Sequence, residues 1–254
     1  MAGIVVETQG KVAVVTLDIP PVNALTLARY QELTETFTAL GRRDDVHCAV
    51  LAARGAKAFC AGLDLKEFAT AAADRDHERA QIVRTTFEAV RTCAIPVIAA
   101  VNGPALGAGC ALTAMCDIRI ASERATFALP EINVGRCGGG AFLGRLIPQG
   151  MMRLMFFTGE PISAWEAHRV GLVEQVVPPR RLEPTVRDLA ELIAAKSPLG
   201  LRLGKRSLNE SEDLPVAEGY QIEQGYSTQL LHTEGAREAT RAALEKRPPR
   251  FVGR

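Results

Sequence analysis

The stretch IPVIAAVNGPALGAGCALTAMCDIRIAS, residues 95–122, decides the fold expected for this chain. Its apolar run at 96–101 predicts a buried strand, and the small residues after it predict a tight turn. An apolar helix is expected to begin at about Ala108. Apolar and polar residues then alternate over 117–122, which predicts another strand. The stretch is therefore a strand–turn–helix–strand unit, which is typical of α/β proteins.

Short apolar runs and helical patterns alternate on both sides of this unit. Strands are expected at residues 12–18, 48–53 and 170–178. Behind Thr26, a residue type that caps helices, apolar residues recur at helical spacing: Tyr30, Leu33, Phe37 and Leu40. A second helical stretch carries Trp165, which we expect in the core.

The pattern changes toward the C-terminus, where no further strand is indicated. We expect an α/β core over residues 1–183 and a C-terminal helical oligomerisation region over residues 184–254. Several apolar residues on the late helices indicate a face that the core alone does not cover: Val216, Tyr220, Tyr226, Leu230 and Leu231.

Composition argues against several classes of protein. The 254 residues are 47% hydrophobic, enough for a large core, and the net charge of +1 leaves no basic footprint for nucleic acid. No apolar run approaches the roughly 18 residues of a membrane span, and the N-terminus lacks a secretory pattern. The six cysteines form no Cys-x-x-Cys pair and the four histidines are scattered, which favours buried thiols over a metal site. We expect a cytoplasmic globular protein with no metal, membrane or nucleic-acid partner.

The turn NGPALGAGC, residues 102–110, has four interpretations. A P-loop requires a lysine that is absent, and a dinucleotide fingerprint is only half met by Gly107 and Gly109, because its last position is Leu112. The turn could serve packing alone. Alternatively, the free N–H groups at the helix start could bind an oxyanion without any reactive side chain. KAFCAGLDLKEF, residues 57–68, offers a second such donor.

Motifs along the chain strengthen the last interpretation. AFCAGLDLKE (58–67), the stretch 95–135 that ends in PEINVG, and LEKRPPRFVGR (244–254) occur in the order and at the spacings of the enoyl-CoA hydratase/isomerase (crotonase) family. The chain resembles this family over essentially its whole length. The resemblance implies a spiral of β-β-α turns and C-terminal helices that build a homotrimer, often a hexamer of two trimers. It also implies an acyl-CoA thioester substrate, with coenzyme A as part of the substrate and no separate cofactor.

In this family two peptide N–H groups stabilise a thioester enolate. The resemblance places the first at Leu63, directly after Ala61 and Gly62. It places the second at Ala108, after Gly107, where the family usually has glycine. Since the donor is a peptide group, alanine preserves it.

Other residues match family positions around the substrate. Asp64 and Lys66 lie near the expected coenzyme A site, Asp64 as a turn or capping residue and Lys66 as a coenzyme A contact. The acyl group is expected near residues 68–85 and 136–143.

The acid/base residues depart from the hydratase pattern. Hydratases hold a water molecule between two glutamates; the second matches Glu131, but the first falls on Ala111, which cannot bind water. Phe142 and Leu143 occupy positions where hydratases carry a Gly-Thr pair, and large apolar groups there would dry the site. Cys137 is expected in the acyl pocket, as packing rather than as a nucleophile. Glu131 is thus expected to be the single acid/base, with a pKa raised by burial.

These observations predict an enzyme of acyl-CoA and fatty acid metabolism that works through a stabilised enolate, as an isomerase or an atypical hydratase. Ring-opening C–C hydrolysis and hydratase-lyase chemistry are alternatives within the family. A non-catalytic acyl-CoA binding protein is an alternative of another class, although the intact FCAGLD and PEINVG motifs argue against it. A nucleotide-binding dehydrogenase is disfavoured by the missing glycine.

Overall fold

The computed structural model describes residues 3–70 and 76–251, and its main feature is a six-stranded sheet. The strand order is β1-β2-β4-β6-β8-β11, with β1 antiparallel to β2 and the other neighbours parallel. The strands are β1 (Gly3–Gln9), β2 (Val12–Asp18), β4 (Cys48–Ala53), β6 (Val97–Val101), β8 (Ile118–Ser122) and β11 (Gln175–Val177). The α/β class expected from the sequence is confirmed.

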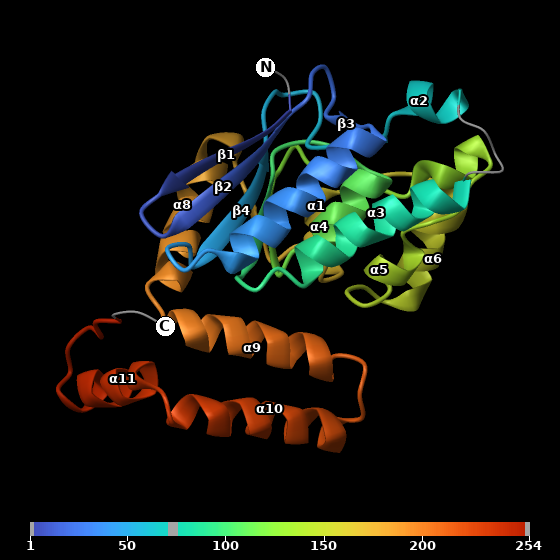
Figure 1. The fold of residues 1–254 in the computed structure, drawn as a ribbon. Helices are drawn as coiled ribbons and strands as arrows, with labels where there is room; N and C mark the ends of the chain where they lie inside the picture. The colour runs from blue at the N-terminus through green and yellow to red at the C-terminus, as the bar shows by residue number, and fades with distance from the viewer. Residues whose placement is uncertain (1–2, 71–75, 252–254) are drawn as a thin grey trace.

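Helices cover both faces of this sheet, as parallel strands require. Alternate residues of β2 show the two layers: Val15 packs in the cluster that contains Phe37 of α1 (Leu27–Arg42). Val12 packs in the cluster that contains Val186 of α8 (Pro179–Ala194). In Figure 1, α1 and α3 (Asp76–Arg91) lie on one side of the strands and α8 on the other.

Very short strands build a second layer next to the main sheet. One small sheet has the order β10-β9-β7 and the other pairs β3 with β5. These strands are β3 (Ala24–Leu25), β5 (Gly62–Leu63), β7 (Ala105–Leu106), β9 (Thr126–Ala128) and β10 (Ile162–Ser163). The helical segments around them are α2 (Leu65–Ala69), α4 (Ala108–Met115), the 3₁₀ helix η2 (Pro130–Val134), α5 (Gly140–Leu143), α6 (Gln149–Thr158) and α7 (Ala164–Arg169).

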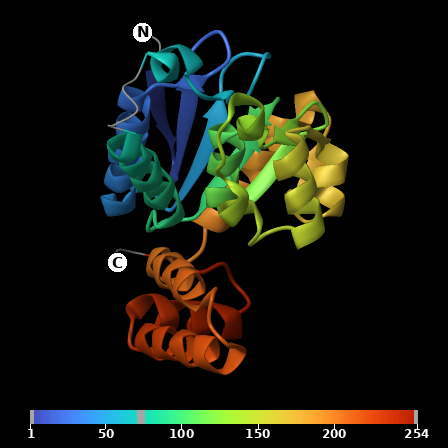
Figure 2. The same cartoon turned by 90° about the vertical axis from the view of Figure 1, so that its right-hand side faces the viewer.

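Three C-terminal helices stand apart from the α/β body (Figures 1 and 2). They are α9 (Pro198–Ser211), α10 (Val216–Leu231) and α11 (Glu234–Leu244). The boundary expected at residue 183 falls inside α8. The apolar side of this helix covers the sheet, so the whole of α8 belongs to the α/β body. The change of organisation therefore comes after α8.

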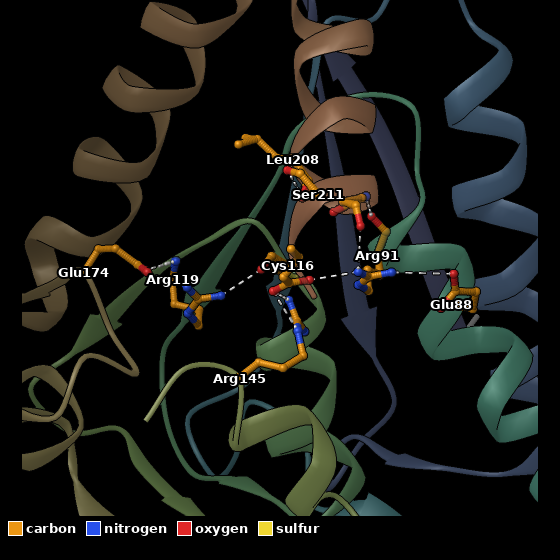
Figure 3. Close-up of polar contacts among 10 residues, drawn as sticks. Glu88, Arg91, Cys116, Arg119, Arg145, Glu174, Leu208 and Ser211 are labelled. Atoms are coloured by element: carbon orange, nitrogen blue, oxygen red, sulfur yellow. Dashed lines mark hydrogen bonds and ion pairs between the residues drawn. The ribbon is translucent and has the colours of Figure 1, made fainter. Parts of the chain in front are cut away.

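Polar contacts tie α9 to the body. Lys205 donates from Nζ to Asp117 at 2.7 Å and to the Ile95 carbonyl at 3.2 Å. Glu212, directly after α9, accepts hydrogen bonds from Arg91 at 2.8 Å and from Arg145 at 2.5 Å. Figure 3 shows both arginines directed toward the end of α9. Charged side chains, rather than a shared apolar core, thus account for much of this attachment.

Most expected elements are present, with two corrections. The run at 170–178 forms a strand only at 175–177, because Gly171 turns the chain with φ +87° after α7. Trp165 is not in the core of this chain, since it is 58% exposed. Val216, on the late helices, is 90% exposed, in keeping with a face that the core does not cover. Within the described residues, no helix is long and apolar enough to cross a membrane.

Candidate active site

The two predicted oxyanion donors lie on neighbouring turns. Leu63 belongs to β5, and the next N–H, that of Asp64, donates to the Leu25 carbonyl of β3 at 2.9 Å. In a parallel ladder this pattern directs the N–H of Leu63 away from β3. Ala108 is the first residue of α4, where the N–H groups have no partner within the helix. Both positions thus have N–H groups suited to an external acceptor.

Glycines bring these turns against each other and against Glu131. A Cβ on Gly62, where φ is +86°, would lie 3.2 Å from the Ala108 nitrogen and 2.7 Å from the Leu106 carbonyl oxygen. A Cβ on Gly107, where φ is +54°, would lie 2.8 Å from Oε1 of Glu131. Only glycine permits this backbone conformation and this approach at low cost. The structure therefore gathers β5, the start of α4 and the Glu131 carboxylate in one place.

Glu131 is the second residue of η2, which follows β9 after Leu129, and it is half-buried. Its Oε2 atom is buried and has no hydrogen-bond partner among the described residues. Burial raises the pKa of this carboxyl group, and a bond to its own backbone opposes the shift. A carboxyl group with a raised pKa suits proton transfer near neutral pH.

The first hydratase glutamate has no counterpart at its usual position. Ala111 lies in α4 and is 2% exposed, packed in the main core. Its methyl group can neither bind nor deprotonate water, so Glu131 has no second carboxylate from position 111.

Three other predicted residues are placed around β5. Asp64 caps α2, as expected, because its side chain accepts hydrogen bonds from Lys66 N at 2.9 Å and Glu67 N at 3.0 Å. The side chain of Lys66 is exposed. The Ala61 N–H donates to the Val22 carbonyl at 3.0 Å and so holds the start of the turn.

The segments expected around the acyl group do come together. Arg136 forms a bidentate ion pair with Asp76, at 2.8 and 2.9 Å, and its guanidinium lies 4.3 Å from the ring centroid of Phe68. Phe142 is half-buried and packs edge-on against another ring. Cys137 is exposed, because the loop after η2 runs over the surface, so its side chain is not enclosed in a pocket of this chain. Residues 71–75 of the expected segment lie outside the described part.

Tyr30 was expected only as one of the apolar residues at helical spacing behind Thr26, and its hydroxyl group was not singled out. The side chain has 0% exposure, and its hydroxyl has no hydrogen-bond partner among the described residues. Burial raises the pKa of this hydroxyl, and the negative charges of Glu131 and Glu67 raise it further. A tyrosine within an otherwise apolar stripe was the available signal, since a buried tyrosine usually finds a partner.

The buried cysteines in the described part of the chain are poorly suited to nucleophilic chemistry. Cys60 is buried, and burial raises the pKa of its thiol to about 12, so it remains protonated. Burial also raises the pKa of Cys110. No cluster of three or more His, Cys, Asp or Glu side chains suited to a metal ion occurs among the described residues.

Comparisons with known proteins agree with this geometry. Residues 7–254 match the enoyl-CoA hydratase/isomerase family. The chain is 38% identical over 230 residues, 90% of its length and 89% of the relative, to (7aS)-7a-methyl-1,5-dioxo-2,3,5,6,7,7a-hexahydro-1H-indene-carboxyl-CoA hydrolase of Rhodococcus jostii. It is 35% identical to 2,3-dehydroadipyl-CoA hydratase of Escherichia coli, over 100% of both chains.

The fold comparison gives the same result. The crystal structure of an enoyl-CoA hydratase from Bacillus anthracis superimposes with a TM-score of 0.95 and 36% identity, covering 99% of this chain and 100% of the other. This chain belongs to the enoyl-CoA hydratase/isomerase family, whose members are enzymes that act on acyl-CoA thioesters. The crotonase fold expected from the sequence is confirmed.

Proposed function

We propose that this enzyme forms an acyl-CoA thioester enolate, with the N–H groups of Leu63 and Ala108 as oxyanion donors and Glu131 as its single acid/base. The observation that carries the proposal is the packing of the Glu131 carboxylate against Gly107, beside Ala108, while Ala111 stands at the other hydratase position. The favoured reaction is movement of a double bond, an isomerase-like activity.

The reaction needs one base and one oxyanion site. The Glu131 carboxylate takes a proton from the α-carbon, and the electron pair of that C–H bond moves into the enolate. Negative charge then develops on the thioester oxygen, where each preorganised donor contributes about 10²–10³ in rate. Protonated Glu131 returns the proton at the γ-carbon, which shifts the double bond. General acid/base help of this kind contributes about 10²–10⁴.

The remaining parts of the proposal concern binding and assembly. Coenzyme A enters as part of the substrate, with the exposed Lys66 as a contact, and no further cofactor is needed. A homotrimer or a hexamer is supported by apolar residues exposed in the single chain, including Tyr220 and Leu231 on α10. We place the enzyme in the cytoplasm and in fatty acid metabolism.

Ring-opening C–C hydrolysis is the second candidate. It is favoured by Ala111 and by the 38% identity to a relative named as a carboxyl-CoA hydrolase. In C–C hydrolysis, Glu131 would take a proton from a water molecule that adds to the ring carbonyl. Breakage of the adjacent C–C bond would then release the same kind of enolate, and protonated Glu131 would return the proton to the α-carbon of that enolate. The two candidates therefore share the oxyanion donors and differ in the bond that breaks.

The test is incubation with a panel of acyl-CoA thioesters in heavy water, with deuterium uptake at the α-carbon and product mass followed by mass spectrometry. Glu131→Gln should lower uptake by about 10²–10⁴ because it removes the base with little change in shape. The matched control is Glu123→Gln, at an exposed turn after β8, which should exchange like the wild type. Equal exchange by Glu131→Gln and wild type would refute the assignment. Tight binding without any exchange would instead favour a non-catalytic binding protein.

A further inference from the structure

The short helix that carries Glu131 is closed by the backbone of Arg136. Gly135 turns the chain with φ +71°, and its N–H donates to the Ile132 carbonyl at 3.2 Å. The Arg136 N–H then donates to the Glu131 carbonyl at 2.9 Å. These two bonds form the Schellman arrangement that ends many helices. Because the backbones of Arg136 and Glu131 are bonded directly, a contact that fixes Arg136 also restricts Glu131.

The side chain of Arg136 binds two other helices. Its two terminal nitrogens donate to the Asp76 carboxylate at the start of α3, at 2.8 and 2.9 Å. Its guanidinium also lies 4.3 Å from the ring centroid of Phe68 on α2. A two-pronged pair of this kind fixes the relative orientation of both groups, and an aromatic ring attracts a cation placed over its face. One side chain therefore joins the η2 turn to both α2 and α3.

Helix α2 is itself attached to the first oxyanion turn. It begins directly after its cap, Asp64, which follows the proposed donor Leu63. Glu67 of α2 accepts the Leu27 N–H at 2.8 Å, which holds α2 against the start of α1. Phe68 thus belongs to a helix that is held beside one of the two proposed donors. The arginine on this ring connects that donor's segment with the segment of the proposed base.

We propose that Arg136 is a positioning residue for Glu131, whose contacts with Asp76 and Phe68 hold the η2 turn at a fixed distance from the oxyanion turn. Arg136 acts through the backbone of Glu131 and not on the reacting atoms. Proton transfer is sensitive to that distance, since a displacement of about 1 Å can lower a rate by about 10²-fold. The inference rests on the proposed function, because it takes Glu131 as the base.

The test is a double-mutant cycle that follows deuterium exchange of butyryl-CoA in heavy water. Arg136→Gln and Asp76→Ala each break the ion pair, and each should lower the exchange rate at saturating substrate about tenfold, with KM changed by less than about threefold. The double variant should lose no more than Arg136→Gln alone, because both changes remove one contact. A loss of about a hundredfold in the double variant would mean separate roles and would overturn the proposal. A loss confined to KM would overturn it as well, since it would indicate a contact with the substrate.

Two further variants act as controls. Arg43→Gln makes the same change in a surface pair, in which Arg43 donates to the Asp45 carboxylate at 3.0 and 2.5 Å. This pair follows the end of α1 that is about 24 Å from Leu27 by the helical rise, so the variant should exchange like the wild type. Arg136→Lys keeps the cation without the two-pronged geometry and should lose only about threefold. Equal losses for Arg43→Gln and Arg136→Gln would contradict a specific role for Arg136.

Thermal unfolding separates positioning from a structural role. The side chains of Arg136 and Asp76 are 41% and 37% exposed, and pairs of this kind contribute little to folding. Arg136→Gln should therefore unfold within about 4 °C of the wild type while it exchanges more slowly. A larger fall in unfolding temperature would make the contact a structural one and overturn the proposal. Absence of exchange by the wild type would mark failure of the proposed function, whereas equal exchange by wild type and Arg136→Gln, with Glu131→Gln inactive, would mark failure of this inference alone.

Discussion

The α/β body and the C-terminal helices are held together in different ways. In the body, the segment that leads into β5 meets α4 through backbone atoms and small residues. A Cβ added to Gly109 would lie only 2.1 Å from the Cys60 carbonyl oxygen. The helices α9–α11 attach through long charged side chains such as Lys205 and Arg91. Close backbone contact tolerates almost no added volume, whereas a charged side chain can adjust its position. The packing therefore fixes the positions of the elements most closely in the body, where the candidate site lies.

The largest effect is expected from adding one methyl group at this close contact. Gly109→Ala should destabilise the protein by about 3 kcal/mol and separate the two oxyanion turns, because the clash involves backbone and not a flexible side chain. Urea unfolding measures the stability and deuterium exchange measures the activity. Gly225→Ala on α10, where a Cβ meets nothing within 4 Å, is the matched control. It should raise stability by about 0.5–1 kcal/mol, since alanine favours a helix. Similar unfolding free energies and similar rates of deuterium exchange for the two variants would contradict the difference between the two regions.

A smaller effect is expected at the attachment of α9. Lys205→Ala removes a buried lysine whose Nζ lies 2.7 Å from Oδ2 of Asp117, so that carboxylate loses its cation. Asp117 is partly exposed and keeps its bond from Val97 N at 2.6 Å, so we expect a loss of about 2 kcal/mol, below the value for fully buried pairs. Arg206→Ala breaks an exposed pair with Glu210 and should cost less stability than Lys205→Ala. Equal unfolding free energies for the two variants would show that burial of the Lys205 pair contributes nothing.

The smallest effect concerns the pH dependence of stability. Because the pKa of Glu131 is raised in the folded protein, folding favours its protonated form. The wild type should therefore lose stability as the pH rises from the ordinary glutamate range through the raised pKa, and then level off. Glu131→Gln lacks this loss and should therefore be slightly more stable than the wild type at neutral pH. Urea unfolding of both proteins from pH 4 to 8 measures the difference; parallel curves would contradict a raised pKa.

Sequence patterns were sufficient for the longer elements. The strand at 12–18 and the helix behind Thr26 form as expected, and the Thr26 side chain caps Arg29 N. These elements span enough residues for a repeating pattern to appear. The two-residue strands β5 and β7 have no such pattern, because two residues contain no period. Their pairing depends on contacts with distant segments, as does the burial of α8 against the sheet.

By itself, the sequence determined the chemical groups at hand: glycine-rich turns with backbone donors, Glu131 kept, and alanine at position 111. These follow from residue identity alone. Only the tertiary structure decided that Gly62 meets Ala108 and that Gly107 meets the Glu131 carboxylate. It also decided that the Tyr30 hydroxyl is buried with no hydrogen-bond partner among the described residues. The reason is physical: whether a polar atom is paired or orphaned depends on neighbours from distant parts of the chain, and packing alone brings those neighbours together.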